Sequence, residues 1–215
     1  MSTNWTEVLE SAERVFAGGA QYLQLPVHVL YTVPPALFTR HVNTPYFLPM
    51  IKLRTRAGAA FPPGIAAARA LIRKRIPDDI LAVILGPDVE PRLEELITWS
   101  GGYPRELIRL LQSVVAIPAQ PVTEPELLRV RNELYDAYRR MVPTDAFPWL
   151  ALVAKSHDLN TQNEEHRKVV DLMLSNNAVL RYLNDNEWYD LHPAVIGIAG
   201  VQDALRALSQ PEKRA

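Results

Sequence analysis

The chain has 215 residues, of which 48% are hydrophobic, and its 23 Lys and Arg nearly balance its 24 Asp and Glu. This length can bury the core of one large domain or two small ones. A net charge of −1 gives no overall field toward nucleic acid or an anionic membrane surface. The absence of cysteine excludes disulfides and thiolate metal sites. No apolar run is long enough for a membrane span, and the acidic N-terminus is unlike a signal peptide, so we expect a cytoplasmic protein.

The first third of the chain is predicted to combine helices with two strands. Helical spacing of apolar residues predicts helices at residues 5–16 and 62–76. Residues 25–32 form a β-rich run closed by prolines, and residues 48–53 predict a second, weaker strand. Because two strands alone do not make a stable sheet, we expect them to be the edge half of a larger parallel α/β sheet.

The motifs that would complete a nucleotide site are missing from the sequence. The phosphate-binding pattern G-x-x-x-x-G-K-[ST], or Walker A, occurs nowhere. Asp78 and Asp79 precede an apolar run and do not follow one, which is the wrong order for a strand end that binds Mg²⁺, or Walker B. The sequence therefore predicts a chain without its own phosphate-binding loop or metal-binding strand.

The middle of the chain is predicted to form a small bundle of three helices. The first helix spans residues 91–99 and ends at Gly101-Gly102, and the second begins at Pro104 and runs to about residue 117. A capping box at residues 123–126 opens the third helix, which runs to residue 141.

Arg105 lies in the first turn of the second of these helices. A cation there opposes the helix dipole, which favours Asp or Glu at this position. The placement suggests that Arg105 has an anionic partner. The alternative is a solvated or ion-paired arginine at a tight corner between helices.

The last third is predicted to form a winged-helix-like end. Helical patterns at residues 147–155 and 161–175 are followed by alternating residues around a turn at 184–186, which is typical of a β-hairpin. The candidate recognition helix and the hairpin mix acids with bases and lack the positive stripe that phosphate binding needs. We therefore favour a protein-contact or capping role over nucleic-acid binding. The charged residues concerned are Glu164, Glu165, Arg167, Lys168, Arg181, Asp185, Glu187 and Asp190.

Other chemistry finds no support in the sequence. His157-Asp158 and Glu164-Glu165-His166 lack a pair of metal ligands at i, i+4, so no metal site is expected. No G-x-S-x-G elbow marks a nucleophile, and no carboxylate pair supports general acid–base catalysis. We therefore assign no catalytic residue.

The stretch Gly101-Gly102-Tyr103-Pro104-Arg105-Glu106-Leu107-Ile108-Arg109-Leu110-Leu111 resembles the sensor-2 corner in the lid of AAA+ and related STAND P-loop ATPases, and is most similar to the initiator/origin-recognition type. In that family the arginine reaches the nucleotide phosphates, which implies this role for Arg105. The resemblance also implies a sensor-1 position at Thr32 and an arginine finger at Arg75. Without the resemblance, Thr32 is a β-branched residue at the end of the predicted strand. Arg75 then complements the dipole at the C-terminus of the predicted helix.

The resemblance implies a chain that is mostly α with a small parallel β portion. Residues 1–86 would be a partial α/β ATPase core, 87–142 a helical lid and 143–215 a winged-helix-like domain. The implied function is a regulatory or interaction module that does not hydrolyse ATP alone and has no cofactor of its own. ATP and Mg²⁺ would bind only if another segment supplied the P-loop.

Two alternatives stay open beside this function. One is a non-enzymatic protein-interaction scaffold, and the other is a winged helix that binds nucleic acid. The incomplete sheet edge at residues 25–32 predicts a protein partner or self-association. No membrane partner is expected.

Overall fold

The computed structural model describes residues 5–18, 26–27, 31–33, 37, 46–159, 164–183 and 186–209. Of residues 5, 6, 17, 18 and 164–168 it describes the backbone alone. Within these ranges, no helix has both the length and the apolar character that crossing a membrane requires.

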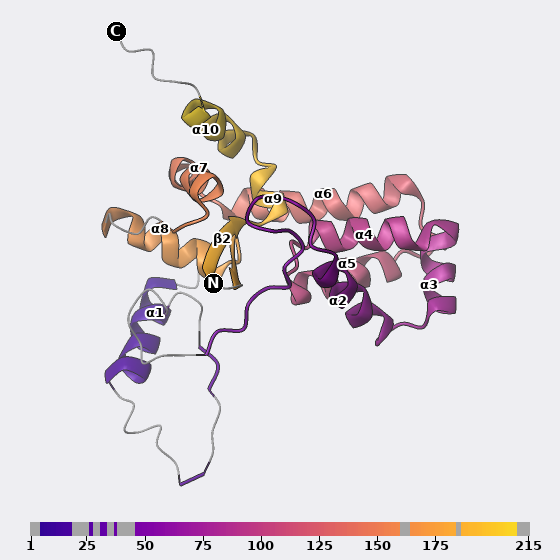
Figure 1. The fold of residues 1–215 in the computed structure, drawn as a ribbon, viewed down its shortest axis with the longest axis horizontal. Helices are drawn as coiled ribbons and strands as arrows, with labels where there is room; N and C mark the ends of the chain where they lie inside the picture. The colour runs from indigo at the N-terminus through magenta and orange to yellow at the C-terminus, as the bar shows by residue number, and fades with distance from the viewer. Residues whose placement is uncertain are drawn as a thin grey trace.

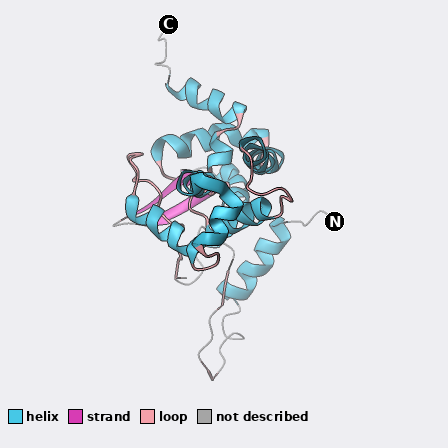
Figure 2. Cartoon of the chain, turned by 90° about the vertical axis from the view of Figure 1, so that its right-hand side faces the viewer, coloured by secondary structure: helices cyan, strands magenta, loops and turns pink. Residues whose placement is uncertain are grey.

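In the described ranges the fold is mostly helical, with one small sheet beside the helices (Figures 1 and 2). The helices are α1 (Trp5–Glu13), α2 (Pro62–Arg73), α3 (Asp78–Leu85), α4 (Val89–Trp99), α5 (Pro104–Val115), α6 (Glu124–Met141), α7 (Phe147–Ser156), α8 (Glu164–Ser175), α9 (Pro193–Ile196) and α10 (Ala199–Ser209). Proline occupies the N1 or N2 position of five of these helices, α2, α5, α6, α7 and α9, where its missing N–H has no helical partner. Single turns of π-helix or 3₁₀-helix form η1 (Arg14–Gly18), η4 (Gly86–Asp88) and η5 (Thr144–Ala146).

The sheet is the predicted hairpin. Strand β1 (Val179–Leu183) pairs antiparallel with β2 (Glu187–Leu191), and Val179 lies opposite Leu191 at the open end, away from the connecting turn. The side chains of Trp188 and Tyr182 stack with their ring centroids 4.5 Å apart and fix this pairing from one face. The prediction of a hairpin is confirmed.

The described residues do not support the predicted parallel α/β core. Of the first predicted strand, residues 26–27 and 31–32 form no strand, and residues 28–30 lie outside the described part of the chain. Residues 46–53, which contain the second, also form no strand. The physical reason is that the backbone of residues 50–53 finds single partners: the Met50 N–H donates to Arg181 at 3.1 Å and the Ile51 N–H to Gly102 at 2.9 Å. Pro49 has no N–H to extend a ladder.

The three predicted middle helices form and pack together. Helix α4 lies against α5, and α5 lies against α6. Leu107, Leu110, Leu111 and Val114 supply the buried face of α5, at the spacing that predicted it. One cluster of buried side chains continues from α2 to α10, so the bundle and the C-terminal elements share a hydrophobic core. The division at 86/87 and 142/143 stays a prediction.

The capping box at the start of α6 forms as the sequence predicts. The Glu126 carboxylate accepts hydrogen bonds from the Thr123 N–H at 2.8 Å and from its hydroxyl at 2.7 Å. These bonds lower the pKa of Glu126.

We expect Thr123→Ala to lower the free energy of unfolding by about 1 kcal/mol, because the helix loses one capping interaction. Urea denaturation measures the change. Thr98→Ala is the matched control, since Thr98 is an exposed threonine inside a helix and alanine is the better helix former there. Equal midpoints for Thr123→Ala and the unmutated chain would contradict the prediction.

Candidate functional site

The corner between α4 and α5 positions the N-terminal turn of α5. Gly101 and Gly102 have φ angles of +61° and +80°, which glycine adopts without steric cost. The Tyr103 N–H donates to the Ser100 carbonyl at 3.0 Å, and Pro104 then occupies the first turn of α5. The two glycines thus reverse the chain within a few residues and turn α5 back along α4.

Other segments of the chain hold this corner in place. The Tyr182 hydroxyl on β1 donates to the Gly101 carbonyl at 2.6 Å, and the Ile51 N–H donates to the Gly102 carbonyl at 2.9 Å. Residues 50–54 therefore cross the corner as a strap. Arg54 ties the strap to β2 through an ion pair of 2.7 Å with Asp190, whose side chain is 5% exposed.

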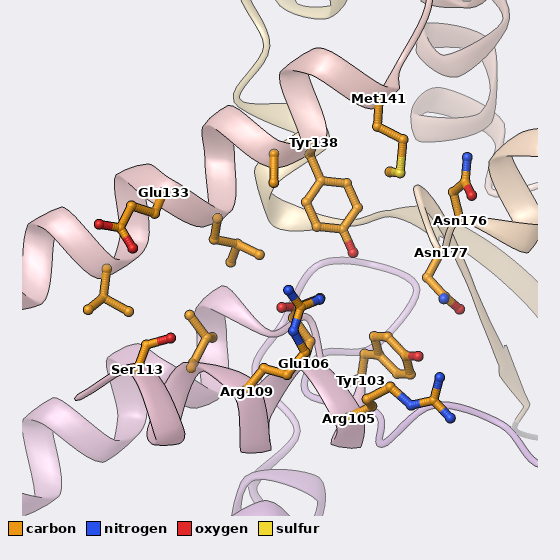
Figure 3. A pocket seen from close by; sticks show the side chains of 14 residues that line it. Tyr103, Arg105, Glu106, Arg109, Ser113, Glu133, Tyr138, Met141, Asn176 and Asn177 are labelled. Carbon is orange, nitrogen blue, oxygen red and sulfur yellow. The ribbon is translucent and has the colours of Figure 1, made fainter. Parts of the chain in front are cut away.

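A pocket of about 340 Å³ opens between α5 and α6 beside this corner (Figure 3). Its apolar wall comes from both helices, and its third side is the turn between α8 and β1. The charged and polar side chains that line it are Tyr103, Arg105, Glu106, Arg109, Ser113, Glu133, Tyr138, Asn176 and Asn177. The size suits a small ligand or a single modified side chain of a partner.

Arg105 lines this pocket, as an anion-binding role would require. Its side chain is exposed and extends in Figure 3 toward the side where Asn176 and Asn177 lie. Among the described residues it has no hydrogen bond or ion pair. Within the described part of the chain, Arg105 is therefore not ion-paired, which leaves a solvated or an anion-binding arginine as the interpretations.

Glu106 also belongs to the site, although the sequence pattern did not indicate it. Its side chain is 7% exposed and lies in the pocket wall between α5 and α6. Arg109 Nη1 lies 3.6 Å from its Oε2, and the Tyr138 hydroxyl hydrogen-bonds to the carboxyl. Burial raises the pKa of Glu106, and Arg109 and Tyr138 oppose that rise. A perturbed carboxyl in a concave site marks a candidate functional group.

Tyr138 and His192 form a layer behind Glu106. Tyr138 is 5% exposed, and burial raises the pKa of its hydroxyl, so this group stays protonated as a donor. Its ring stacks on the His192 ring with the centroids 4.2 Å apart. His192 is fully buried, and its Nδ1 accepts a hydrogen bond of 3.2 Å from the Ala194 N–H. The hydroxyl that contacts Glu106 is thus held by a packed ring pair.

The structure does not bring the other two predicted site residues to this pocket. Thr32 is exposed in the irregular segment 31–33. Arg75 lies just beyond the end of α2, where its Nη1 donates to the Leu71 carbonyl at 3.0 Å. That bond to the last turn of α2 agrees with the interpretation of Arg75 as a complement to the helix dipole. Neither residue lines the pocket with Arg105.

Among the described side chains, no group of three or more His, Cys, Asp or Glu is placed to hold a metal ion. The side chains of residues 164–166, considered from the sequence, lie outside the described set.

Comparison of the chain with protein-family models, with curated proteins and with solved structures finds no match. The chemistry of the α5–α6 pocket is therefore the basis for a functional proposal.

Proposed function

We propose that the chain is a regulatory or interaction module that does not hydrolyse ATP by itself, and that its α5–α6 pocket binds a phosphate-bearing group through Arg105. The observation that carries the proposal is an arginine without a partner among the described residues on the wall of a 340 Å³ pocket. An arginine fork matches phosphate oxygens in geometry as well as in charge.

Further features of the pocket support an anionic ligand. Arg109 adds a second cation one helical turn beyond Arg105, and its side chain is 67% exposed although it lies near Glu106. The Asn176 and Asn177 amides provide neutral donors on the opposite side. The strap and the hairpin hold the corner, so the first turn of α5 is fixed before a ligand arrives.

The resemblance of residues 101–111 to a sensor-2 corner also supports a phosphate ligand. The described residues form no parallel core of the kind that accompanies such a corner in the ATPase family, so the proposal rests on the pocket. The lack of G-x-x-x-x-G-K-[ST] supports a module without ATP hydrolysis of its own. Binding of ATP and Mg²⁺ together with a P-loop-bearing segment stays a prediction.

A winged-helix-like end stays a prediction too. The order α7, α8, β1, β2 agrees with it. Ion pairs of Arg181 with Glu187 and of Arg54 with Asp190 neutralise the described charges of the hairpin. This arrangement offers phosphate no positive surface on the described hairpin and favours a protein-contact or capping role.

We expect Arg105→Ala to weaken binding of inorganic phosphate by about tenfold or more, because a charge-assisted bidentate contact is lost. The measurement follows the side-chain amide signals of Asn176 and Asn177 by NMR during a phosphate titration. Arg75→Ala is the matched control, since it removes an exposed arginine outside the pocket. The proposal fails if phosphate leaves the pocket signals unmoved, or if both variants bind phosphate as the unmutated chain does.

A further inference from the structure

We infer that the α5–α6 pocket selects an oxyanion that carries its own proton, such as hydrogen phosphate, over a fully ionised one such as sulfate, and that Glu106 makes this selection. The inference rests on the proposed function of the pocket and names the ligand class that this function requires.

Glu106 lies next to the place where an anion would contact Arg105 and Arg109. Its carboxyl is almost fully buried yet belongs to the pocket wall, one residue from Arg105 along α5. Figure 3 shows it between the two helices, close to the Arg109 guanidinium and below the Tyr138 hydroxyl. An oxyanion that reaches both arginines would therefore lie beside this carboxyl.

The Glu106 carboxyl has more hydrogen-bond acceptor positions than its neighbours in the protein use. An ionised carboxylate accepts hydrogen bonds at about four lone-pair positions and donates none. Arg109 and Tyr138 approach it with one group each, Arg109 at the long distance of 3.6 Å. Glu106 can thus accept a further hydrogen bond from a ligand in the pocket.

The protonation of the ligand decides whether the Glu106 carboxylate repels or attracts it. A ligand oxygen without a proton would face the carboxylate as acceptor against acceptor and as like charges at low local dielectric. A ligand hydroxyl turns the same approach into a hydrogen bond with an ionised acceptor, which is shorter and stronger than a neutral one. Inorganic phosphate retains at least one proton at pH 7.5, as hydrogen phosphate or dihydrogen phosphate. Sulfate has no such proton at that pH.

Glu106 is the pocket group that we expect to discriminate between phosphate and sulfate. The pocket groups around it that carry charge or titrate are Arg105 and Arg109 on α5, Glu133 and Tyr138 on α6, and Tyr103 at the corner, with His192 behind Tyr138. Tyr138 stays protonated because burial raises its pKa. Glu133 is exposed and lies 3.9 Å from Arg129, so solvent screens its charge.

The test compares Glu106→Gln with the unmutated chain. The glutamine keeps the shape of the side chain and an oxygen for the Tyr138 hydroxyl, and its amide can donate to an anion. Phosphate and sulfate are titrated separately at pH 7.5 and constant ionic strength, with the Asn176 and Asn177 amides as reporters. We expect the unmutated chain to prefer phosphate by about tenfold or more. Glu106→Gln should bring the ratio of the two affinities to about one or invert it.

Glu133→Gln is the matched control, because it neutralises another carboxyl of the pocket wall that is exposed. Its phosphate-to-sulfate ratio should equal that of the unmutated chain. Equal affinities for the two anions in the unmutated chain, or an unchanged ratio in Glu106→Gln, would overturn the inference and leave an anion pocket in place. Absence of binding by both anions, or indifference to Arg105→Ala, would instead remove the proposed function, and the inference with it.

A pH series on the unmutated chain tests the same inference if Glu106→Gln does not fold. A protonated Glu106 donates a hydrogen bond, so sulfate should bind more tightly as the pH falls through the pKa of this group. Burial raises that pKa, so the change begins at a higher pH than for an ordinary glutamate. The phosphate-to-sulfate ratio should therefore fall on acidification, and a ratio that does not change with pH overturns the inference.

Discussion

Gly102→Ala is expected to lower the free energy of unfolding by roughly 3 kcal/mol or more. Gly102 has a φ of +80°, and a Cβ at this position would lie 1.9 Å from the Ile51 carbonyl oxygen. That atom belongs to the backbone of the strap, so no side-chain rotation relieves the clash. The strap must move away, and the hydrogen bond from the Ile51 N–H to the Gly102 carbonyl is then strained or lost.

Gly58→Ala separates the two causes of this loss. Gly58 has a φ of +84°, close to that of Gly102, but a Cβ there meets nothing within 4 Å. This control pays only the cost of a left-handed backbone, about 1–2 kcal/mol. Urea denaturation of both variants gives the difference. Similar losses in the two variants would show that the strap does not press on the corner.

The local signals of the sequence predicted the helical part of the fold. Apolar residues at helical spacing placed the buried face of α5, the capping box at Thr123 placed the start of α6, and turn residues placed the hairpin. Each of these features depends on residues within about ten positions of one another. Such patterns carry their own physical cause, so the chain alone reveals them.

The strap could not be predicted in the same way. Residues 48–53 are apolar and extended, which is typical of a strand, and nothing near them in the sequence names a partner. Their backbone bonds go to Gly102 and Arg181, about 50 and 130 positions further along the chain. A tertiary contact therefore decided the state of this segment. The prediction of a parallel sheet depended on this segment being a strand, which its neighbours in the sequence could not determine.

The sequence singled out one residue of the pocket, and its role there stays a prediction. Arg105 lines a pocket beside a fixed corner, which agrees with the prediction of an anionic partner. Glu106 was missed because an acid in the first helical turn is explained by the dipole alone. A signal was present, since Glu106 lies four positions before Leu110, on the stripe that α5 buries. Thr32 and Arg75 entered through the resemblance alone, and neither lines the pocket with Arg105.

The stability of the fold is expected to fall on acidification because of His192. Burial lowers the pKa of this residue from its ordinary value of 6.5 to about 3. Between these two values the unfolded chain carries a proton on His192 and the folded chain does not. The contribution of His192 is therefore fully present above pH 6.5 and declines as the pH falls toward 3. From pH 6 to pH 4 we expect a loss of roughly 2–3 kcal/mol from this residue.

His192→Asn isolates this contribution from that of the carboxyl groups. Asparagine keeps an acceptor for the Ala194 N–H at the start of α9 but does not titrate. The variant loses the stacking on Tyr138, so its stability is lower at neutral pH. Between pH 6.5 and 3, the slope of its unfolding free energy against pH should be smaller by the equivalent of about one bound proton. Chemical denaturation at a series of pH values gives both slopes. Parallel curves would mean that His192 gains a proton without unfolding. Water would then reach the layer behind Glu106, and the ring pair would not hold the Tyr138 hydroxyl against the pocket.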